Sequence, residues 1–494
     1  MPELLLGIDL GTTGTKAILL DPSAGVVAEA TRPATLHSER PGFAEGDTAQ
    51  WWANVCSVIP ELLDRAAASP GDVAGVATSG MVPAVILLDG DGEPLGRALL
   101  QNDARAGREI AEVGASLAGL DLVALTGSAL TQQSVAPTLL WFAHHEPDVR
   151  AATRSVAGSY DWLLRRLGAE PHVERNWALE SGLFDLDGEP VMPVFDAAGI
   201  EATLVPPVAQ PGTVVGAVSS AAASECGLAA GTPLVVGGAD HVLSAYAAGL
   251  SVPGDLLIKL GGAGDILIVS ARPFTDARLY LDAHPISDLW LPNGCMATSG
   301  SLIRWLQALL GGPDLLELDA EAEARPAGDV LCLPYFLGEK SPLHDPDLRG
   351  AFVGLHLGHD RGAMYRAVLE AVAFGFRHHV EVLAERGLEV GHVRVTNGGS
   401  RSVLWKQIHA DVLGRELSPV VDHPGASLGA ALAAGIGTGL IEDWAAVERF
   451  VRLGDPVVPR RELARDYDDA YALWRRLGDA LTPISHSIAA RSRA

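Results

Sequence analysis

The sequence predicts an α/β protein built from two related domains. Its 494 residues exceed what one compact core usually holds, which favours two units of about 200–250 residues. A hydrophobic share of 48%, a charged share of 20% and 55 glycines are typical of an α/β protein and unlike a disordered or fibrous chain. The third observation is a repeated pattern, because the apolar runs at 5–17 and 257–266 each break into a turn of small residues and then resume.

Both turns have the pattern of a β-hairpin whose tip exposes backbone N–H groups. The first is Gly11-Thr12-Thr13-Gly14 and the second is Gly261-Gly262-Ala263-Gly264. Glycine lets the backbone approach an anion without a Cβ in the way, and successive N–H groups can form a concavity that binds phosphate. Two such tips, half a chain apart, predict a nucleotide held between the two domains.

The first half of the chain opens with strands. Apolar runs predict a hairpin at 4–20 and a third strand at 26–31. Asp47 is a plausible N-cap for the helix that follows, since its side-chain oxygen can accept from the free N–H groups of the first turn. Apolar side chains recur after it at helical spacing, namely Trp51, Trp52, Val55 and Ile59.

Two further buried strands are predicted at 73–78 and 85–88, with a turn at 88–94. This turn begins with Asp-x-Asp but lacks the other ligands of a calcium loop, so a plain hairpin turn is favoured. Residues 233–236 form a further predicted strand, which ends in the tight turn 237–240.

The chain is punctuated by Pro253-Gly254-Asp255 after the next helix, and we therefore place the two domains at residues 1–248 and 249–494. In the second domain, helical periodicity is long at 361–386 and clear at 402–413. The small residues at 425–435 predict a helix suited to close packing.

Charge and cysteine usage exclude several classes of function. A formal charge of −25 disfavours binding to nucleic acid or to an anionic membrane, because both need a local excess of Lys and Arg. The N-terminus lacks the basic region and long apolar stretch of a signal peptide or membrane helix, which predicts a cytoplasmic protein. The four cysteines are isolated and indicate neither a disulfide framework nor a zinc site: Cys56, Cys226, Cys295 and Cys332.

Asp9 is the candidate metal ligand. It is placed where the first predicted strand delivers a carboxylate to the mouth of a cleft, and Mg²⁺ is usually shared between carboxylates, water and substrate phosphates. A carboxylate that caps the turn is the alternative. Lys16, just past the loop, could reach a phosphate or be a solvated charge at the strand end.

Asp240 is the candidate general base. It follows Gly237-Gly238 and opens a helix, so its carboxylate could accept the proton of an alcohol to which a phosphoryl group is transferred. An N-cap role fits the same position equally well. His241 reads as a residue of the cleft wall or a structural histidine. No Walker P-loop and no serine-hydrolase elbow is present, which leaves a glycine-hairpin phosphotransferase as the strongest enzyme class.

A third glycine segment, Asn397-Gly398-Gly399-Ser400, follows a predicted strand and opens a helix. Bare backbone at a helix N-terminus would let a flat adenine ring lie against it. A simple strand-to-helix turn would have the same sequence.

With these residues in place, the chain closely resembles the FGGY carbohydrate kinases, which belong to the actin-like ATPase superfamily. The resemblance is specific because many segments occur in the right order over essentially the whole length. Residues 9–16 and 259–262 look like the two phosphate loops, and 237–240 corresponds to the segment that carries the catalytic aspartate. Further similar segments are 41–52, the nucleotide-side helix at 298–305, the C-terminal signature at 336–355 and the adenosine motif at 398–405.

The resemblance implies two RNase-H-like domains with an interdomain cleft that holds ATP and Mg²⁺, with the sugar or polyol in the N-terminal half. Asp240 would take the proton of the acceptor hydroxyl, and Asp9 would serve the metal. The implied nucleotide-binding residues are Thr12, Thr13, Gly14, Lys16, Gly261, Gly262, Gly300, Gly398, Gly399 and Ser400. The implied substrate-binding residues are Met81, Asn102, Asp103, Asp240 and His241.

Departures from the family pattern fall where the substrate is chosen. Met81-Val82-Pro83 stands where xylulose kinases typically have Gln-Met-His and glycerol kinases an Arg-Glu pair, which argues against glycerol and weakens xylulose. Asn102-Asp103 and Arg105 remain, whereas Gln101 replaces a tryptophan.

The leading hypothesis is ATP-dependent phosphorylation of a small ketose, a pentulose such as xylulose, or a polyol. Its alternatives are a catalytically silent sugar or nucleotide sensor and a partner-coupled ATPase. A homodimer is the assembly we consider, and the roles of His241 and Lys259 stay open.

Overall fold

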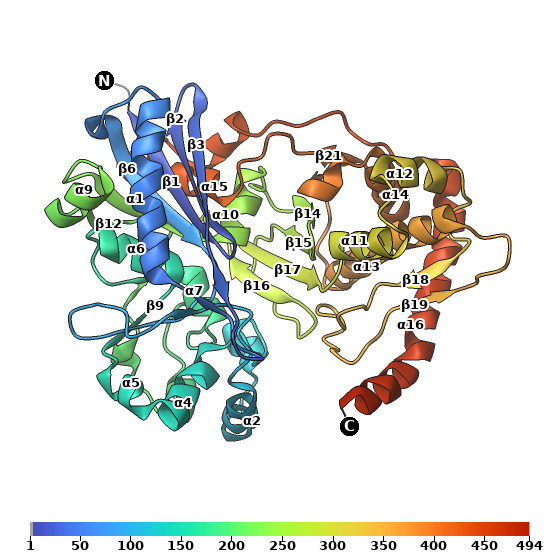
Figure 1. The fold of residues 1–494 in the computed structure, drawn as a ribbon, viewed down its shortest axis with the longest axis horizontal. Helices are drawn as coiled ribbons and strands as arrows, with labels where there is room; N and C mark the ends of the chain where they lie inside the picture. The colour runs from blue at the N-terminus through green and yellow to red at the C-terminus, as the bar shows by residue number, and fades with distance from the viewer. Residues whose placement is uncertain (1–2, 494) are drawn as a thin grey trace.

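The computed structural model describes residues 3–493 and contains two six-stranded sheets with helices packed on them (Figure 1). The first sheet has the order β12-β13-β6-β1-β2-β3 and the second β16-β17-β15-β14-β20-β21. The strands of the first are β1 (Leu4–Gly11), β2 (Gly14–Asp21), β3 (Gly25–Pro33), β6 (Val73–Gly80), β12 (Val214–Ala217) and β13 (Pro233–Ala239). Those of the second are β14 (Leu256–Leu260), β15 (Gly264–Ile268), β16 (Tyr280–Ala283), β17 (Trp290–Met296), β20 (Val393–Thr396) and β21 (Leu417–Pro419).

Five strands of each sheet repeat one topology. β1, β2 and β3 pair antiparallel, as do β14, β15 and β17. On the other side of the first strand the pairing is parallel, through β6 and β13 in the first sheet and through β20 and β21 in the second. The predicted fold class, two related α/β domains of the actin-like ATPase type, is confirmed.

Short strands complete the sheet structure of the described chain. They are β4 (Leu36–His37), β5 (Glu45–Gly46), β7 (Ile86–Leu88), β8 (Ala98–Leu99), β9 (Ser155–Ala157), β10 (Val173–Glu174), β11 (Val208–Ala209), β18 (Leu331–Leu333) and β19 (Ala351–Val353).

Helices of the first half are α1 (Thr48–Arg65), α2 (Gly107–Ser116), α3 (Leu122–Thr126), α4 (Val135–His145), α5 (Pro147–Ala152), α6 (Ser159–Leu167), α7 (Arg175–Glu180), α8 (Met192–Ala197), α9 (Ser220–Cys226) and α10 (Asp240–Ala247). Those of the second half are α11 (Gly300–Leu309), α12 (Leu315–Glu323), α13 (Arg361–Glu385), α14 (Val403–Leu413), α15 (Ala426–Thr438) and α16 (Ala464–Arg493). The helices predicted at 361–386 and 402–413 are thus confirmed as α13 and α14.

Two local predictions in the first half can be followed to single hydrogen bonds. Asp47 caps α1, since its side chain accepts from the amides of Ala49 and Gln50. In the turn at 88–94, the carboxylate of Asp89 accepts from the amides of Asp91 and Glu93, which closes a plain turn. The turn predicted at this segment is confirmed.

The small-residue helix α15 lies on the first sheet although it comes late in the chain. Its buried side chains share one apolar cluster with strands β1, β2, β6 and β13 and with α10, and Figure 1 shows it beside β1. Glycines permit this approach: a Cβ on Gly7 would lie 2.0 Å from the carbonyl oxygen of Ser427, and one on Gly429 would lie 2.5 Å from that of Leu243. The first half is therefore completed by a helix from the second.

Candidate active site

Both glycine turns are the tips of hairpins, as the sequence predicts. Gly11 pairs with Gly14 to close the β1–β2 hairpin around Thr12 and Thr13. Leu260 pairs with Gly264 to close the β14–β15 hairpin. The sequence folds this way because apolar residues continue each strand up to the turn, where only small residues remain.

The second hairpin tip gathers the predicted nucleotide-binding glycines of the second half. The carbonyl of Gly261 accepts from the amide of Gly300 at the start of α11, and that of Gly262 accepts from the amide of Ser301. A Cβ on Gly300 would lie 2.7 Å from the Gly261 carbonyl oxygen, so this position requires glycine.

Gly398, Gly399 and Ser400 belong to the 3₁₀ turn η3 (Gly398–Arg401) beside the same hairpin. A Cβ on Gly399 would lie 2.2 Å from the ring of Trp405 and 2.7 Å from Leu260 on β14. The turn is thereby held against the strand that leads into the second hairpin.

Asp9 lies opposite Lys16 across the first hairpin. Burial, followed by the negative charge of Asp240, raises the pKa of its carboxyl to about 7, against the opposing effect of Lys16 and Lys259. Its Oδ1 is buried and has no hydrogen-bond partner among residues 3–493. Because Lys259 comes from β14, the first and second hairpins act on one charge and face a common crevice.

Beside the second hairpin lies a cleft of about 290 Å³ lined by residues from both halves, including Asp240, His241, Lys259 and Lys340. Asp240 is the first residue of α10, and the helix is capped by Ala239 without help from a described side chain. The N-cap alternative for Asp240 is therefore wrong, and its carboxylate, 37% exposed, is available at the cleft.

The other predicted substrate residues lie away from the cleft lining. Met81 is 1% exposed in the core, and Asn102 is exposed. Asp103 is buried in a bidentate pair with Arg105 and accepts from the amide of Ala44. Of the five residues predicted to bind substrate, Asp240 and His241 line the cleft.

Their sequence neighbours take their place. Val82 and Gln101 line the cleft, and the Gln101 amide lies 3.5 Å from the hydroxyl of Thr12 on the first hairpin. Both segments that resemble the family's substrate-binding motifs therefore reach the cleft. The side chains that line it, Val82 and Gln101, are one residue away in the chain from the predicted Met81 and Asn102.

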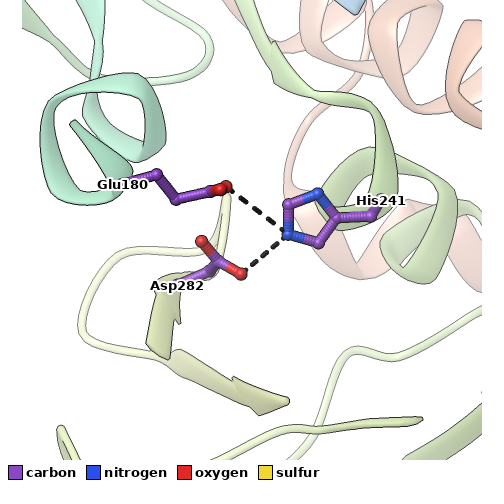
Figure 2. A group of neighbouring side chains, drawn as sticks. All are labelled: Glu180, His241 and Asp282. Atoms are coloured by element: carbon purple, nitrogen blue, oxygen red, sulfur yellow. Dashed lines mark hydrogen bonds and ion pairs between the residues drawn. The ribbon is translucent and has the colours of Figure 1, made fainter. Parts of the chain in front are cut away.

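Sequence reasoning missed the groups that surround His241. The His241 Nε2 lies 2.7 Å from Asp282 Oδ2 on β16 and 3.8 Å from Glu180 Oε1 at the end of α7 (Figure 2). Asn293 also donates to Asp282, at 2.7 Å. Glu180 and Asp282 stand in no motif, so their sequence context gave no signal.

Charge is concentrated in this group. Burial would lower the pKa of His241, but the charge of Asp282 and its contacts with Asp240 and Glu180 raise it well above the ordinary value. Burial and the charge of Asp282 likewise raise the pKa of Glu180. One oxygen of each carboxylate and a ring nitrogen of His241 lie within 4.8 Å of one another, so the three side chains form one compact group.

Two glycine hairpins near one carboxylate in a cleft, on a duplicated actin-like fold, are the features of a phosphotransferase. Comparison with models of protein families shows which family of phosphotransferases the chain matches. Residues 4–247 match the N-terminal domain and residues 263–438 the C-terminal domain of the FGGY family of carbohydrate kinases. The chain belongs to the FGGY family, and it is an ATP-dependent sugar kinase.

Individual relatives agree over nearly the full length. The xylulose kinase of Staphylococcus epidermidis is 28% identical over 486 residues, which is 96% of each chain, and the autoinducer-2 kinase of Yersinia enterocolitica is 29% identical over 98% of this chain and 96% of its own. The crystal structure of xylulose kinase from Rhodospirillum rubrum is 43% identical, with a TM-score of 0.92 over 98% of this chain and all of that one.

Among the helices of residues 3–493, none combines the length and the apolar character needed to cross a membrane.

Proposed function

We propose that this kinase transfers the γ-phosphate of ATP to a hydroxyl of a small ketose, with Asp240 as the general base. The observation that carries the proposal is the carboxylate of Asp240, which caps no helix and lies in a cleft lined by Lys259 of the second hairpin and by Gln101, whose amide contacts Thr12 of the first. A pentulose such as xylulose is the favoured acceptor, because it is the substrate named for the R. rubrum and S. epidermidis relatives. A cleft of about 290 Å³ with polar side chains such as Gln101, Gln133 and Asn293 suits a molecule rich in hydroxyl groups.

In the proposed reaction, the carboxylate of Asp240 accepts the proton of the acceptor hydroxyl while that oxygen forms its bond to the γ-phosphorus. The bond from the γ-phosphorus to the bridging oxygen breaks, and ADP leaves with that electron pair. Backbone amides at Thr12, Thr13, Gly261 and Gly262 would hold the phosphates, and the glycine turn at 398–400 would lie beside the adenosine.

Asp9 fits a magnesium site. Its buried Oδ1 lacks a partner in the described chain, and carboxylate oxygen is the donor that Mg²⁺ prefers. When bound, Mg²⁺ supplies positive charge to the phosphate oxygens as the phosphoryl group moves. Lys16 and Lys259 stand on the two hairpins beside Asp9 and add fixed positive charge there.

The same proposal divides the chain into a sugar-binding domain at 1–248 and a nucleotide-binding domain at 249–494. The two repeated sheets support this division, and so do the separate family matches, which end at 247 and resume at 263. Helix α15 is then a segment of the second domain that packs on the first.

Two properties of the whole enzyme complete the proposal. A cytoplasmic location is supported by the reaction itself, since it consumes ATP. A homodimer is supported by apolar side chains on α16, where Leu473 is 51% and Ile484 54% exposed. Light scattering of the purified chain measures its mass and tests the dimer.

The kinase assay uses ATP, Mg²⁺ and a panel of ketoses and polyols, and measures ADP formed in the presence and absence of each sugar. We expect one ketose to raise ADP formation well above background. Asp240→Asn should abolish turnover and leave ATP affinity within about twofold, whereas Asp91→Asn in an exposed turn serves as the matched control. An active Asp240→Asn enzyme would remove the base from the proposal.

A further inference from the structure

The ring of His241 lies between carboxylates from three elements. Asp240, on the same helix, has its Oδ1 3.5 Å from His241 Nδ1. On the opposite side of the ring, Nε2 faces Asp282 at 2.7 Å and Glu180 at 3.8 Å, and Figure 2 shows both side chains pointing toward it. One imidazole therefore connects the candidate base to the buried Asp282 and the partly exposed Glu180.

Asp282 is a fixed partner for the ring. Its side chain is 2% exposed and receives a second hydrogen bond from Asn293. The next residue, Ala283, exchanges two hydrogen bonds with the side chain of Asn176 on α7, at 2.7 and 3.0 Å. Strand β16 of the second sheet is thus fastened to α7 of the first half, and Asp282 holds His241 from that position.

Asp240 lies among charged side chains. Asp9 on β1 and Glu180 on α7 both interact electrostatically with it. Lys16 and Lys259 stand beside Asp9. His241 supplies the cation in contact distance of Asp240 itself.

We propose that His241 is a positioning residue: held by Asp282 as an imidazolium, it keeps the carboxylate of Asp240 ionised and oriented for the acceptor hydroxyl. This inference rests on the proposed role of Asp240 as base. Against the effect of burial, the neighbouring carboxylates raise the pKa of His241 well above its ordinary value, with Asp282 making the largest favourable contribution, and this favours the charged ring.

The first experiment is the pH dependence of kcat at saturating sugar and MgATP. His241→Gln removes the charge and keeps a hydrogen-bonding side chain, so the acid limb of the kcat–pH profile should shift to higher pH by about one unit. Its kcat should fall about tenfold at the acid end and recover to near the wild-type value at about pH 8. His241→Lys restores a cation and should return the limb toward its original position.

A loss of kcat that is equal at every pH, or a change in the sugar KM alone, would overturn the inference, because a packing role or a direct sugar contact predicts those results. If Asp240→Asn is active, the proposed base itself fails. If Asp240→Asn is inactive and the limb of His241→Gln does not move, this inference fails alone.

A second measurement does not depend on turnover. Nitrogen NMR of the labelled imidazoles should show His241 still protonated at about pH 8 in the wild type, and losing its proton at least one pH unit lower in Asp282→Asn. Thermal unfolding of each variant checks that the fold is retained. A His241 ring that is neutral at about pH 7 in the wild type would overturn the proposed imidazolium.

Discussion

Asp9 should make the fold less stable as the pH rises, and its replacement by Asn should remove this effect. The pKa of this carboxyl is about 7 in the folded chain against a usual value of 3.8, chiefly because of burial. Between these two values the folded state holds a proton that the unfolded state has lost, so the free energy of unfolding decreases with rising pH. Above about pH 7 the folded protein bears the full free-energy cost of keeping the Asp9 carboxyl group ionised in its buried position.

The size of the cost follows from the two values. A rise from 3.8 to about 7 corresponds to about 4 kcal/mol at 1.36 kcal/mol per pH unit, which is a ceiling. Because the cleft admits solvent, we expect about 1–3 kcal/mol. Asp9→Asn should therefore be more stable than the wild type at about pH 8, and the gap should shrink by about 1–2 kcal/mol at about pH 5.

Urea unfolding at the two pH values, with a chelator present, measures the gap. Asp265→Asn is the matched control, because Asp265 is the carboxylate that faces Lys259 across the second hairpin, at 3.6 Å, and it is one-third exposed. Added Mg²⁺ should stabilise the wild type more than Asp9→Asn, since the metal binds the folded state through that carboxylate. A gap that is the same at both pH values, or a less stable Asp9→Asn, would refute the reasoning.

Three further outcomes test the fold and the cleft. Gly7→Ala should lower the free energy of unfolding, measured in thermal melts, by about 2–3 kcal/mol, because its Cβ would lie 2.0 Å from a carbonyl oxygen of α15. The control Gly107→Ala has open space around it and should leave the stability unchanged. Equal effects of the two substitutions would contradict the packing of α15. Asp103→Asn should lower the free energy of unfolding by about 3 kcal/mol, because it breaks the buried ion pair with Arg105, and should leave the KM for the sugar within about twofold of the wild-type value. A large rise in this KM with unchanged stability would instead support a contact with the sugar. Lys259→Met should lower kcat/KM for ATP at least about tenfold in steady-state assays, and unchanged constants would remove Lys259 from the phosphate site.

The hairpins and Asp240 could be predicted because their signals are local. Glycine at the tip and apolar residues on both sides determine a hairpin within about a dozen residues. Strand β13 delivers Asp240 to the start of α10, although the tight turn predicted at 237–240 is wrong, because the strand continues through Gly237-Gly238 to Ala239. The capping choice for Asp240 was open in the sequence, because the N-cap and the first helical residue differ by one position.

Contacts between segments that are far apart in the chain could not be predicted from the sequence. Glu180 and Asp282 lie 61 and 41 residues from His241, respectively, and each looks like an ordinary surface acid in its own segment. Asp103 satisfied a substrate motif, yet Arg105 two positions along takes its carboxylate into a structural pair. The close packing of α15 could be predicted from its small residues, but its partner sheet could not, since any flat surface would accept it.

The charges in the cleft bear on which acceptor it can hold. In the proposed binding mode the sugar lies beside the carboxyl groups of Asp240, Glu180 and Asp282, and two lysines that could balance an anion, Lys259 and Lys340, line the same cleft. An uncharged ketose meets hydrogen-bond acceptors there, but a carboxylate on the acceptor would face like charge. The phosphorylated product carries new negative charge beside the same acids, so the arrangement that admits a neutral sugar also favours release of its phosphate ester.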